Sequence, residues 1–167
     1  QGIPTYDGRD TFVADGGLEL VEVADGIWRE RYEGSFVRYR YEAGADYWVA
    51  EYPDGSVGYF GADASGQRQS LARVEDGPER TARYHLVERV DVRGHRLVYD
   101  YQPDGRARLL DTISYVFGAD DTPRYIIQLG YEARPDALED GRFGFAVATT
   151  RRLRDVIVRV RGQQQRR

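Results

Sequence analysis

Cysteine, methionine and lysine are all absent from this sequence of 167 residues. Without cysteine the chain has no disulfide, no thiolate nucleophile and no cysteine-ligated metal. Long hydrophobic runs are absent too, and no segment approaches the roughly 20 apolar residues of a membrane-spanning helix. Because the sequence begins with Gln1 rather than methionine, we expect it to be a processed product or one part of a longer protein.

Because lysine is absent, all 24 basic side chains belong to arginine, and they are unevenly distributed. Residues 142–167 contain eight arginines and a single acid, Asp155, whereas the rest of the chain is acidic. A basic segment of this kind can contact nucleic acid. Here the arginines alternate with valine and isoleucine, so we expect them to lie on one face of a β-strand. We do not expect a nucleic-acid partner. Residues 163–167 are predicted to form a frayed tail.

The aromatic residues are dominated by tyrosine, with 13 Tyr against 6 Phe and 2 Trp. Tyrosine suits a pleated surface, since its ring is apolar and its hydroxyl is polar. Seven Asp-Gly pairs divide the chain, and this dipeptide accepts the positive φ angles of tight hairpin turns. Between these pairs the apolar residues recur with a period of two, as at Val37, Tyr39 and Tyr41.

These patterns predict an all-β fold, an antiparallel hairpin meander of about ten strands without a helix. Two segments lack the alternation and are predicted as loops, residues 61–77 and residues 134–141. The alternation changes phase near Asp155, which indicates a β-bulge. The last strand, residues 156–160, is apolar and has no edge protection. We therefore expect the sheet to be part of a larger curved sheet or shell, joined through open edges to the parent protein or to neighbouring subunits.

Six short stretches after residue 48 resemble, in the same order, the N-terminal region of SpvB-type proteins and Tc-toxin B components, which are related to RHS/YD-repeat toxin shell proteins. The stretches are YPDGSVGYFG at 52–61, YHLVERVDVRG at 84–94, RLVYDY at 96–101, LDTISY at 110–115, YEARPD at 131–136 and residues 144–158. On this basis residues 48–162 form the SpvB/RHS-like sheet region. Residues 1–47 match more loosely and are predicted to form N-terminal hairpins, and residues 163–167 are the tail.

The resemblance implies a β-sheet that curls into a hollow shell around a toxic segment. It therefore implies a secreted, extracellular protein whose partners are the rest of the shell and the encapsulated toxin segment. The expected role is that of a non-catalytic structural scaffold.

Catalytic and metal-binding groups are scarce. His85 and His95 are the only histidines, and we expect His85 on the surface of a strand and His95 in a turn. The acidic pairs at 120–121 and 139–140 lie beside turn residues and lack the spacing of a calcium loop. The sequence also lacks a nucleophile elbow, a phosphate-binding loop and a zinc-protease motif. We therefore predict no catalytic, cofactor-binding or metal-binding residue and expect that the chain is not an enzyme.

One group of aromatic residues could form a surface for a ligand or a partner. It comprises Trp28, Tyr32, Tyr39, Tyr41, Tyr47 and Trp48. Aromatic strand residues more often fill a core, but such a group could also bind a glycan or a small ligand. Two alternatives to the shell therefore stay open, a stand-alone β-barrel or β-sandwich that binds through this group and a subunit of an extracellular fibre.

Overall fold

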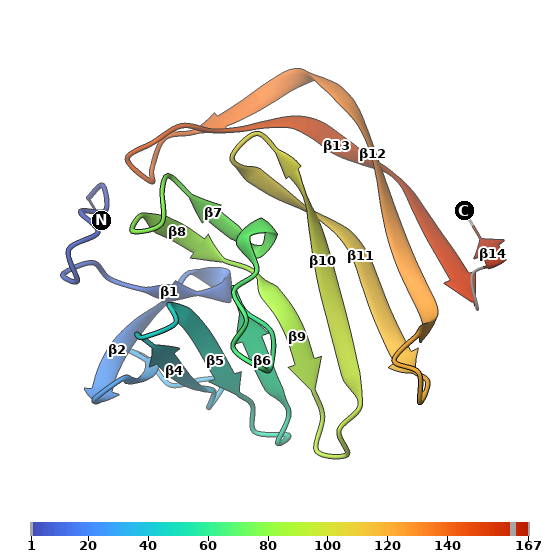
Figure 1. The fold of residues 1–167 in the computed structure, drawn as a ribbon. Helices are drawn as coiled ribbons and strands as arrows, with labels where there is room; N and C mark the ends of the chain where they lie inside the picture. The colour runs from blue at the N-terminus through green and yellow to red at the C-terminus, as the bar shows by residue number, and fades with distance from the viewer. Residues whose placement is uncertain (1, 161–162, 167) are drawn as a thin grey trace.

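The computed structural model describes residues 2–160 and 163–166, and the regular secondary structure of this part of the chain is almost entirely β-strand (Figure 1). Two short 3-10 turns lie at Asp15–Gly17 and Ser70–Ala72. The strands are β1 (Val13–Ala14), β2 (Leu18–Ala24), β3 (Ile27–Glu30), β4 (Arg38–Glu42), β5 (Tyr47–Glu51), β6 (Val57–Phe60), β7 (Arg73–Glu75), β8 (Thr81–Tyr84), β9 (Leu86–Val90), β10 (Arg96–Asp104), β11 (Ala107–Phe117), β12 (Pro123–Asp140), β13 (Val147–Val160) and β14 (Gln163–Arg166).

Twelve of these strands form one antiparallel sheet in the order β1-β2-β3-β4-β5-β6-β9-β10-β11-β12-β13-β14. The sheet curls, and the separate two-stranded ribbon β7–β8 lies beside β9 (Figure 1). The predicted all-β meander is confirmed. Within the described residues β1 and β14 are separate edges, so the sheet is open and the closed barrel considered as an alternative is wrong.

Six of the seven Asp-Gly pairs lie at turns between paired strands, as the sequence predicts, and Asp7-Gly8 precedes the first strand. Between β5 and β6, Gly55 has a φ of +79°, and a Cβ atom there would lie 2.5 Å from Cγ1 of Val92. The side chain of Asp54 accepts hydrogen bonds from the backbone N–H and the hydroxyl of Ser56, at 2.9 and 2.6 Å. Glycine is therefore required at position 55 by both backbone conformation and space.

Details of the strands differ from the sequence pattern in three places. The predicted loop at residues 61–77 contains β7, and the predicted loop at residues 134–141 lies mostly within β12. The bulge is confirmed, because Gly130 pairs with Asp155 while Tyr131 pairs with Leu153, leaving Arg154 as the extra residue. In the predicted tail, β14 pairs with the end of β13, and residues 161, 162 and 167 lie outside the described residues.

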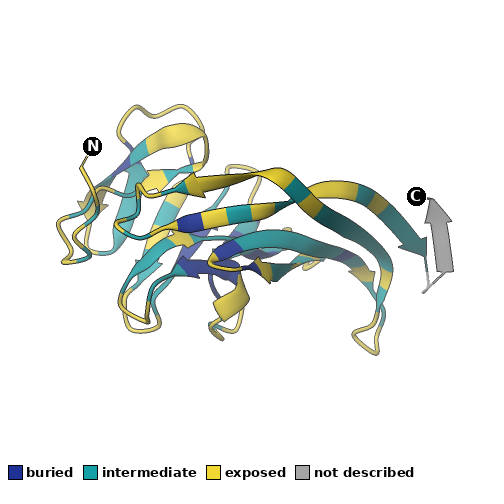
Figure 2. Cartoon of the chain, turned by 90° about the horizontal axis from the view of Figure 1, so that it is seen from above, coloured by how far each residue is buried: buried dark blue, intermediate teal, exposed yellow. Residues whose placement is uncertain are grey.

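Burial is concentrated among the short strands (Figure 2). We call residues 12–90 the compact half and residues 96–160 the long-strand half. In the compact half, Trp48, Val49 and Ala50 are consecutive and all buried. Since successive strand residues point to opposite faces, β5 is covered on both sides. The strand also crosses the predicted boundary at residues 47 and 48, and the division of the chain there stays a prediction.

The long-strand half has one small buried cluster, where Val74 of β7 meets Ala107 and Val147, with Phe143 and Phe145 packed against it. Val147, Phe143 and Phe145 belong to the tip of the β12–β13 hairpin, which we define as residues 138–151, so the cluster packs the tip against the rest of the sheet. Buried Asp104 holds this tip by accepting hydrogen bonds from the backbone N–H groups of Thr150 and Arg151, at 2.6 and 3.0 Å. The tip is thus tied to the turn between β10 and β11.

Candidate functional site

Strand register in the long-strand half collects apolar side chains on one side of the sheet. Tyr99 pairs with Ile113, Ile113 with Ile127, and Ile127 with Val158. Paired residues in antiparallel strands point to the same face. We call this side the apolar face, and its residues are Leu97, Tyr99, Tyr101, Leu110, Ile113, Tyr115, Tyr125, Ile127, Leu129, Tyr131, Leu153, Val156, Val158 and Val160.

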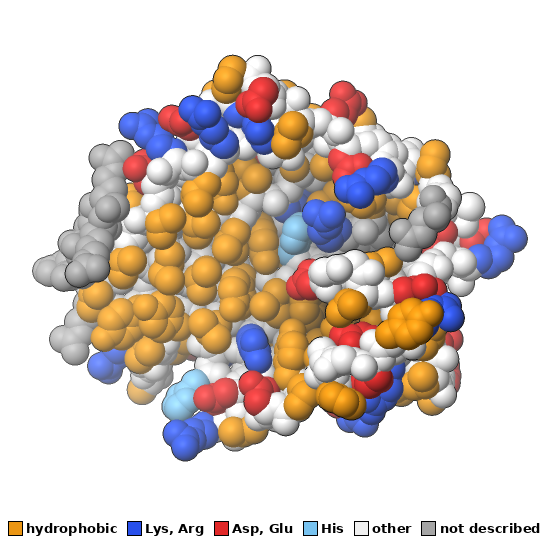
Figure 3. Space-filling view, turned by 180° about the vertical axis from the view of Figure 1, so that it is seen from behind, with side chains coloured by type: hydrophobic (Ala, Val, Ile, Leu, Met, Phe, Trp, Pro, Cys, Tyr) orange, Lys and Arg blue, Asp and Glu red, His pale blue; other side chains and the backbone are white. Residues whose placement is uncertain are grey.

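None of the side chains on the apolar face is buried, and Val156 is 44% exposed. Seen from behind, they form a broad hydrophobic patch with charged side chains along its border (Figure 3). The rings of Tyr115 and Tyr125 stack on this face with centroids 5.1 Å apart. Contiguous exposed apolar surface on this scale is typical of an interaction site.

The opposite side of the same strands is more polar, although Val98, Ile126 and Ile157 also lie on it. Arg152 and Glu132 are paired residues and form an ion pair of 2.8 Å, and Arg159 donates a hydrogen bond to Gln128 at 3.1 Å. One side of the long strands therefore suits water and the other suits an apolar partner.

The predicted aromatic group is only partly brought together. Trp28, Tyr41 and Trp48 form a packed cluster, in which the centroid of Trp48 lies 5.7 Å from Trp28 and 4.9 Å from Tyr41. Phe12 joins it, 4.8 Å from Trp48, and was missed by the sequence analysis because it belongs to the N-terminal segment. Trp48 is only 6% exposed, so this cluster is the core of the compact half.

The other three predicted aromatic residues lie around this core. Tyr39 pairs with Trp28 across β3 and β4, and burial raises its pKa to about 12. Tyr32 is 84% exposed beyond the end of β3. Tyr47 lies near Gly66, whose ideal Cβ position is 3.5 Å from the tyrosine hydroxyl. No continuous platform of six aromatic side chains forms, and ligand binding by this group remains a prediction.

A buried polar network lies next to the aromatic core. Arg73 is fully buried, and its Nη1 atom lies 2.6 Å from Oδ2 of Asp46. The hydroxyls of Tyr84 and Tyr41 donate to the other oxygen of Asp46, at 2.5 and 2.9 Å. Burial alone would raise the pKa of Asp46, but these hydrogen bonds and the charge of Arg73 outweigh it and hold the pKa below its usual value. The network joins the turn between β4 and β5 to the β7–β8 ribbon.

The two histidines occupy different environments. His95 is exposed in the turn between β9 and β10, as predicted, with its Nδ1 atom 2.9 Å from Oδ2 of Asp91. His85 differs from the prediction, because its ring stacks on Tyr101 with centroids 5.0 Å apart and is mostly removed from solvent. Burial, with smaller contributions from the charges of Arg83 and Arg108, lowers the pKa of His85 to about 4. The imidazole is therefore neutral at physiological pH.

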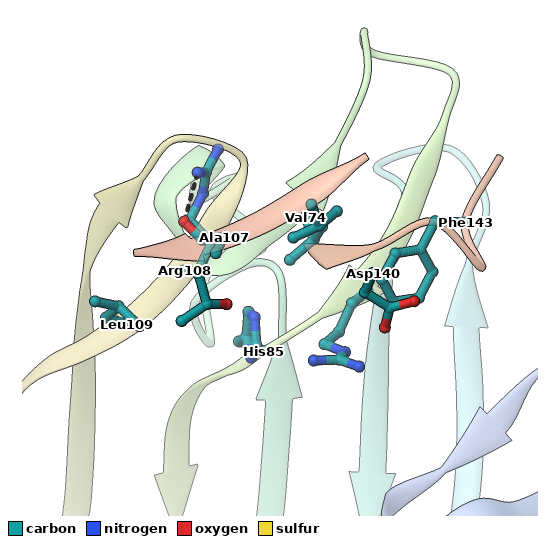
Figure 4. A pocket seen from close by; sticks show the side chains of 10 residues that line it. Val74, His85, Ala107, Arg108, Leu109, Asp140 and Phe143 are labelled. Atoms are coloured by element: carbon teal, nitrogen blue, oxygen red, sulfur yellow. Dashed lines mark hydrogen bonds between the residues drawn. The ribbon is translucent and has the colours of Figure 1, made fainter. Parts of the chain in front are cut away.

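A cavity of about 130 Å³ lies beside His85, between the β7–β8 ribbon, β11 and the tip of the β12–β13 hairpin (Figure 4). Its polar lining consists of Arg83, His85, Arg108, Asp140 and Thr149, and apolar side chains such as Val74 and Leu109 form the remaining wall. We call this the His85 cavity. Among the described residues no cluster of three or more His, Cys, Asp or Glu could hold a metal ion. No helix in this part of the chain is long and apolar enough to cross a membrane.

Comparison with known proteins places this architecture. No protein-family model matches the chain, and no curated protein matches it. Among solved structures, the N-terminal domain of the effector protein SpvB from Salmonella typhimurium strain LT2 superposes with a TM-score of 0.80 at 19% identity, over 94% of this chain and 72% of that one. The chain has the SpvB N-terminal domain fold. The resemblance seen in the sequence is thus confirmed at the level of the fold.

Tc-toxin structures share this fold. TcdB2-TccC3 without its hypervariable C-terminal region matches with a TM-score of 0.78 at 21% identity. The Photorhabdus luminescens Tc holotoxin pore matches with the same TM-score and identity. In both cases the match covers 94% of this chain but only 10% of the other, so this chain spans about a tenth of the length of the Tc chains.

Proposed function

We propose that this chain is a non-catalytic wall segment of an exported toxin complex of the SpvB or Tc type, where it forms part of the shell around a cargo. The observation that carries this proposal is the apolar face, one side of the sheet whose apolar side chains are not covered by any other part of the described chain. A sheet that is polar on one side and apolar on the other is suited to separate water from an enclosed segment.

The C-terminal edge of the sheet supports the same role. β13 has 14 residues, but it pairs with β14 only at Val158, Arg159 and Val160. Within the described residues, the outer edge of β13 before Val158 has no strand beside it. Unpaired edges of this length are templates for further strands, which the rest of a shell would supply.

The fold comparison points the same way, since domains of this fold occur in SpvB and in Tc-toxin assemblies. Export follows from membership in such a complex. The partners would be the rest of the parent shell or neighbouring subunits at the open edges, with the cargo segment inside.

The natural gene product tests this role. An antibody to this chain would follow the product through size-exclusion chromatography of culture medium and cell lysate, and the eluted species would be measured by intact mass. We expect an assembly far larger than the 19.1 kDa chain, containing a segment that resists protease until the shell is opened. A free monomer of about this mass, without co-eluting protein, would overturn the proposal.

A pair of variants tests the apolar face directly. Ile127→Glu places a charge on the apolar face, whereas Gln128→Glu places the same charge on the opposite side of the same strand. In the natural assembly we expect Ile127→Glu to release the cargo or a neighbouring segment, and Gln128→Glu to leave the assembly intact. Circular dichroism of both isolated variants controls for loss of the fold.

A further inference from the structure

We propose that the His85 cavity binds a carboxylate group, with Arg83 and Arg108 supplying the positive charge. Both arginines line the cavity together with His85. Figure 4 shows His85 and Arg108 on its wall, with the Arg108 side chain hydrogen-bonded to the β10–β11 turn. Two cations on the wall of one small cavity repel each other and attract an anion.

Among the described residues neither arginine forms an ion pair, although the charge of Arg83 acts on Asp140 and helps to lower the pKa of that carboxyl. Arg83 lies over the ring of Phe143, with its Cζ atom 5.5 Å from the centroid. Arg108 donates through Nη1 to the backbone carbonyl oxygens of Gly105 and Ala107, at 2.9 and 3.0 Å. The Nε atom of Arg108 is buried and has no hydrogen-bond partner among the described residues. Such an unpartnered donor is costly unless a ligand or water satisfies it.

The acid that lines the cavity, Asp140, is already neutralised. Its Oδ2 atom lies 2.8 Å from Nη2 of Arg142, and its Oδ1 atom accepts from Nε of Arg142 at 3.0 Å. These hydrogen bonds are the largest cause that lowers the pKa of Asp140 to about 2. Arg142 is thus the main partner of Asp140, with a smaller contribution from the charge of Arg83, and one acid faces three arginines in and around the cavity.

The size and lining of the cavity define the class of ligand. A volume of about 130 Å³ is well below the 300–1,000 Å³ of pockets that hold drug-sized ligands, so the cavity suits a small group rather than a whole glycan. Its other wall is apolar, formed by side chains such as Val74, Leu109 and Val147. A carboxylate on an aliphatic stem fits this mixed lining, since its charge meets the arginines and its stem meets the apolar wall.

The cavity also adjoins the apolar face, because His85 stacks on Tyr101, which belongs to that face. An extended apolar peptide on the apolar face could therefore place an acidic side chain in the cavity. The carboxylate is thus supplied by an acidic residue within an apolar peptide segment. The binding of a carboxylate in the cavity does not depend on the proposed role as a wall segment. That the carboxylate belongs to a peptide on the apolar face does rest on that role.

The experiment uses histidine imidazole signals in NMR, since the chain has only His85 and His95. The protein is titrated with sodium acetate and, as a control, with sodium chloride at the same ionic strength. The signals of the exposed His95 serve as the internal reference. We expect acetate to shift the His85 signals saturably and to raise the pKa of His85, because a nearby anion favours the charged imidazolium. A response no larger than that to chloride would overturn the proposal.

Arginine variants test the assignment. Arg83→Gln and Arg108→Gln should each weaken acetate binding at least fivefold, while Arg152→Gln, on the polar side of β13, should leave it unchanged. Thermal unfolding of each variant shows whether it is folded, and exposed Arg83 supplies a test if Arg108→Gln is destabilised. Unchanged acetate binding in a folded Arg83→Gln, Arg108→Gln double variant would contradict the assignment.

Two peptides distinguish the sources of the carboxylate. One is an apolar peptide with a single glutamate, and the other has glutamine in its place. Binding of the glutamate peptide at least tenfold tighter than acetate, with loss of binding in the glutamine peptide, supports the peptide source. Equal affinities of acetate and the glutamate peptide would overturn that source and assign the cavity to small free carboxylates.

Discussion

The compact half of the sheet is covered on both sides at its centre, around β5, whereas the long-strand half leaves one side uncovered. In β5 three consecutive residues are buried, among them Val49 at 1% exposure. In the described strands β10–β13 no two consecutive residues are buried. Both halves nevertheless show the same alternation of apolar and polar residues in sequence.

The difference comes from segments outside the strands themselves. Phe12, from the N-terminal segment, packs across Trp28 and Trp48. The β7–β8 ribbon adds Arg73 and Tyr84 to the same half. The long strands receive no such covering segment among the described residues, except beneath the hairpin tip. Alternation in sequence therefore predicts that a face is apolar, but not whether anything covers it.

The largest expected effect is in the compact half. Arg73→Ala removes the buried cation and leaves Asp46 without its closest charge partner. Asp46 is partly exposed and keeps other partners, so the loss comes mainly from the emptied site of Arg73 and from its hydrogen bonds to Asp46 and Gly61. We expect the free energy of unfolding in urea to fall by about 4 kcal/mol. Arg68→Ala is the matched control, because Arg68 also lies 3.1 Å from Asp46 but is partly exposed and should cost less than about 1 kcal/mol. Equal losses would contradict a special role for burial.

A valine pair compares the two halves directly. Val49→Ala removes two buried carbon atoms from the centre of the compact half, and we expect a loss of about 2 kcal/mol. Val156→Ala makes the same change on the apolar face and should cost less than about 1 kcal/mol in the isolated chain. The measurement is urea unfolding followed by tryptophan fluorescence and circular dichroism. A large loss in Val156→Ala would show that the apolar face is covered in solution.

Local features of the fold could be predicted from the sequence. The Asp-Gly pairs predicted six of the hairpin turns, and the change of phase near Asp155 predicted the bulge. Both signals are local, since a turn or a bulge depends on a few neighbouring residues. The resemblance of six short stretches to SpvB-type proteins predicted the overall fold, and the structural comparison with SpvB confirms it.

Features that depend on contacts between distant residues were missed. β7 has only three residues, too few to show alternation, and is held by pairing with β8. β12 continues through Pro135, and a shift in its pairing with β13 between Ala133 and Leu138 accommodates this proline. His85 was wrongly assigned to a strand surface, because it lies between β8 and β9 and stacks on Tyr101 of β10, a contact that the sequence pattern does not show. The His85 cavity could not be predicted for the same reason.

His85 gives the compact half a pH dependence. Its pKa is about 4 in the fold and 6.5 as a model value, so the unfolded chain binds more protons between these pH values. The stability is therefore fully present above about pH 6.5 and is lost as the pH falls toward 4, by about 3 kcal/mol in total. Urea unfolding at several pH values measures this slope. His85→Gln should flatten it, whereas His95→Gln in the exposed turn should not.

The smallest expected effect is at the hairpin tip, where the long-strand half is held down. Asp104→Ala leaves the backbone N–H groups of Thr150 and Arg151 without their acceptor and should lower global stability by about 1 kcal/mol. Because the tip can open without unfolding the sheet, amide hydrogen exchange at these two residues should rise far more than exchange in β5. Asp100→Ala, which removes an exposed bond to the Thr112 hydroxyl, is the control and should leave exchange at the tip unchanged. If exchange rose equally in the tip and in β5, the two halves would unfold as one unit and the contrast between them would be confined to burial.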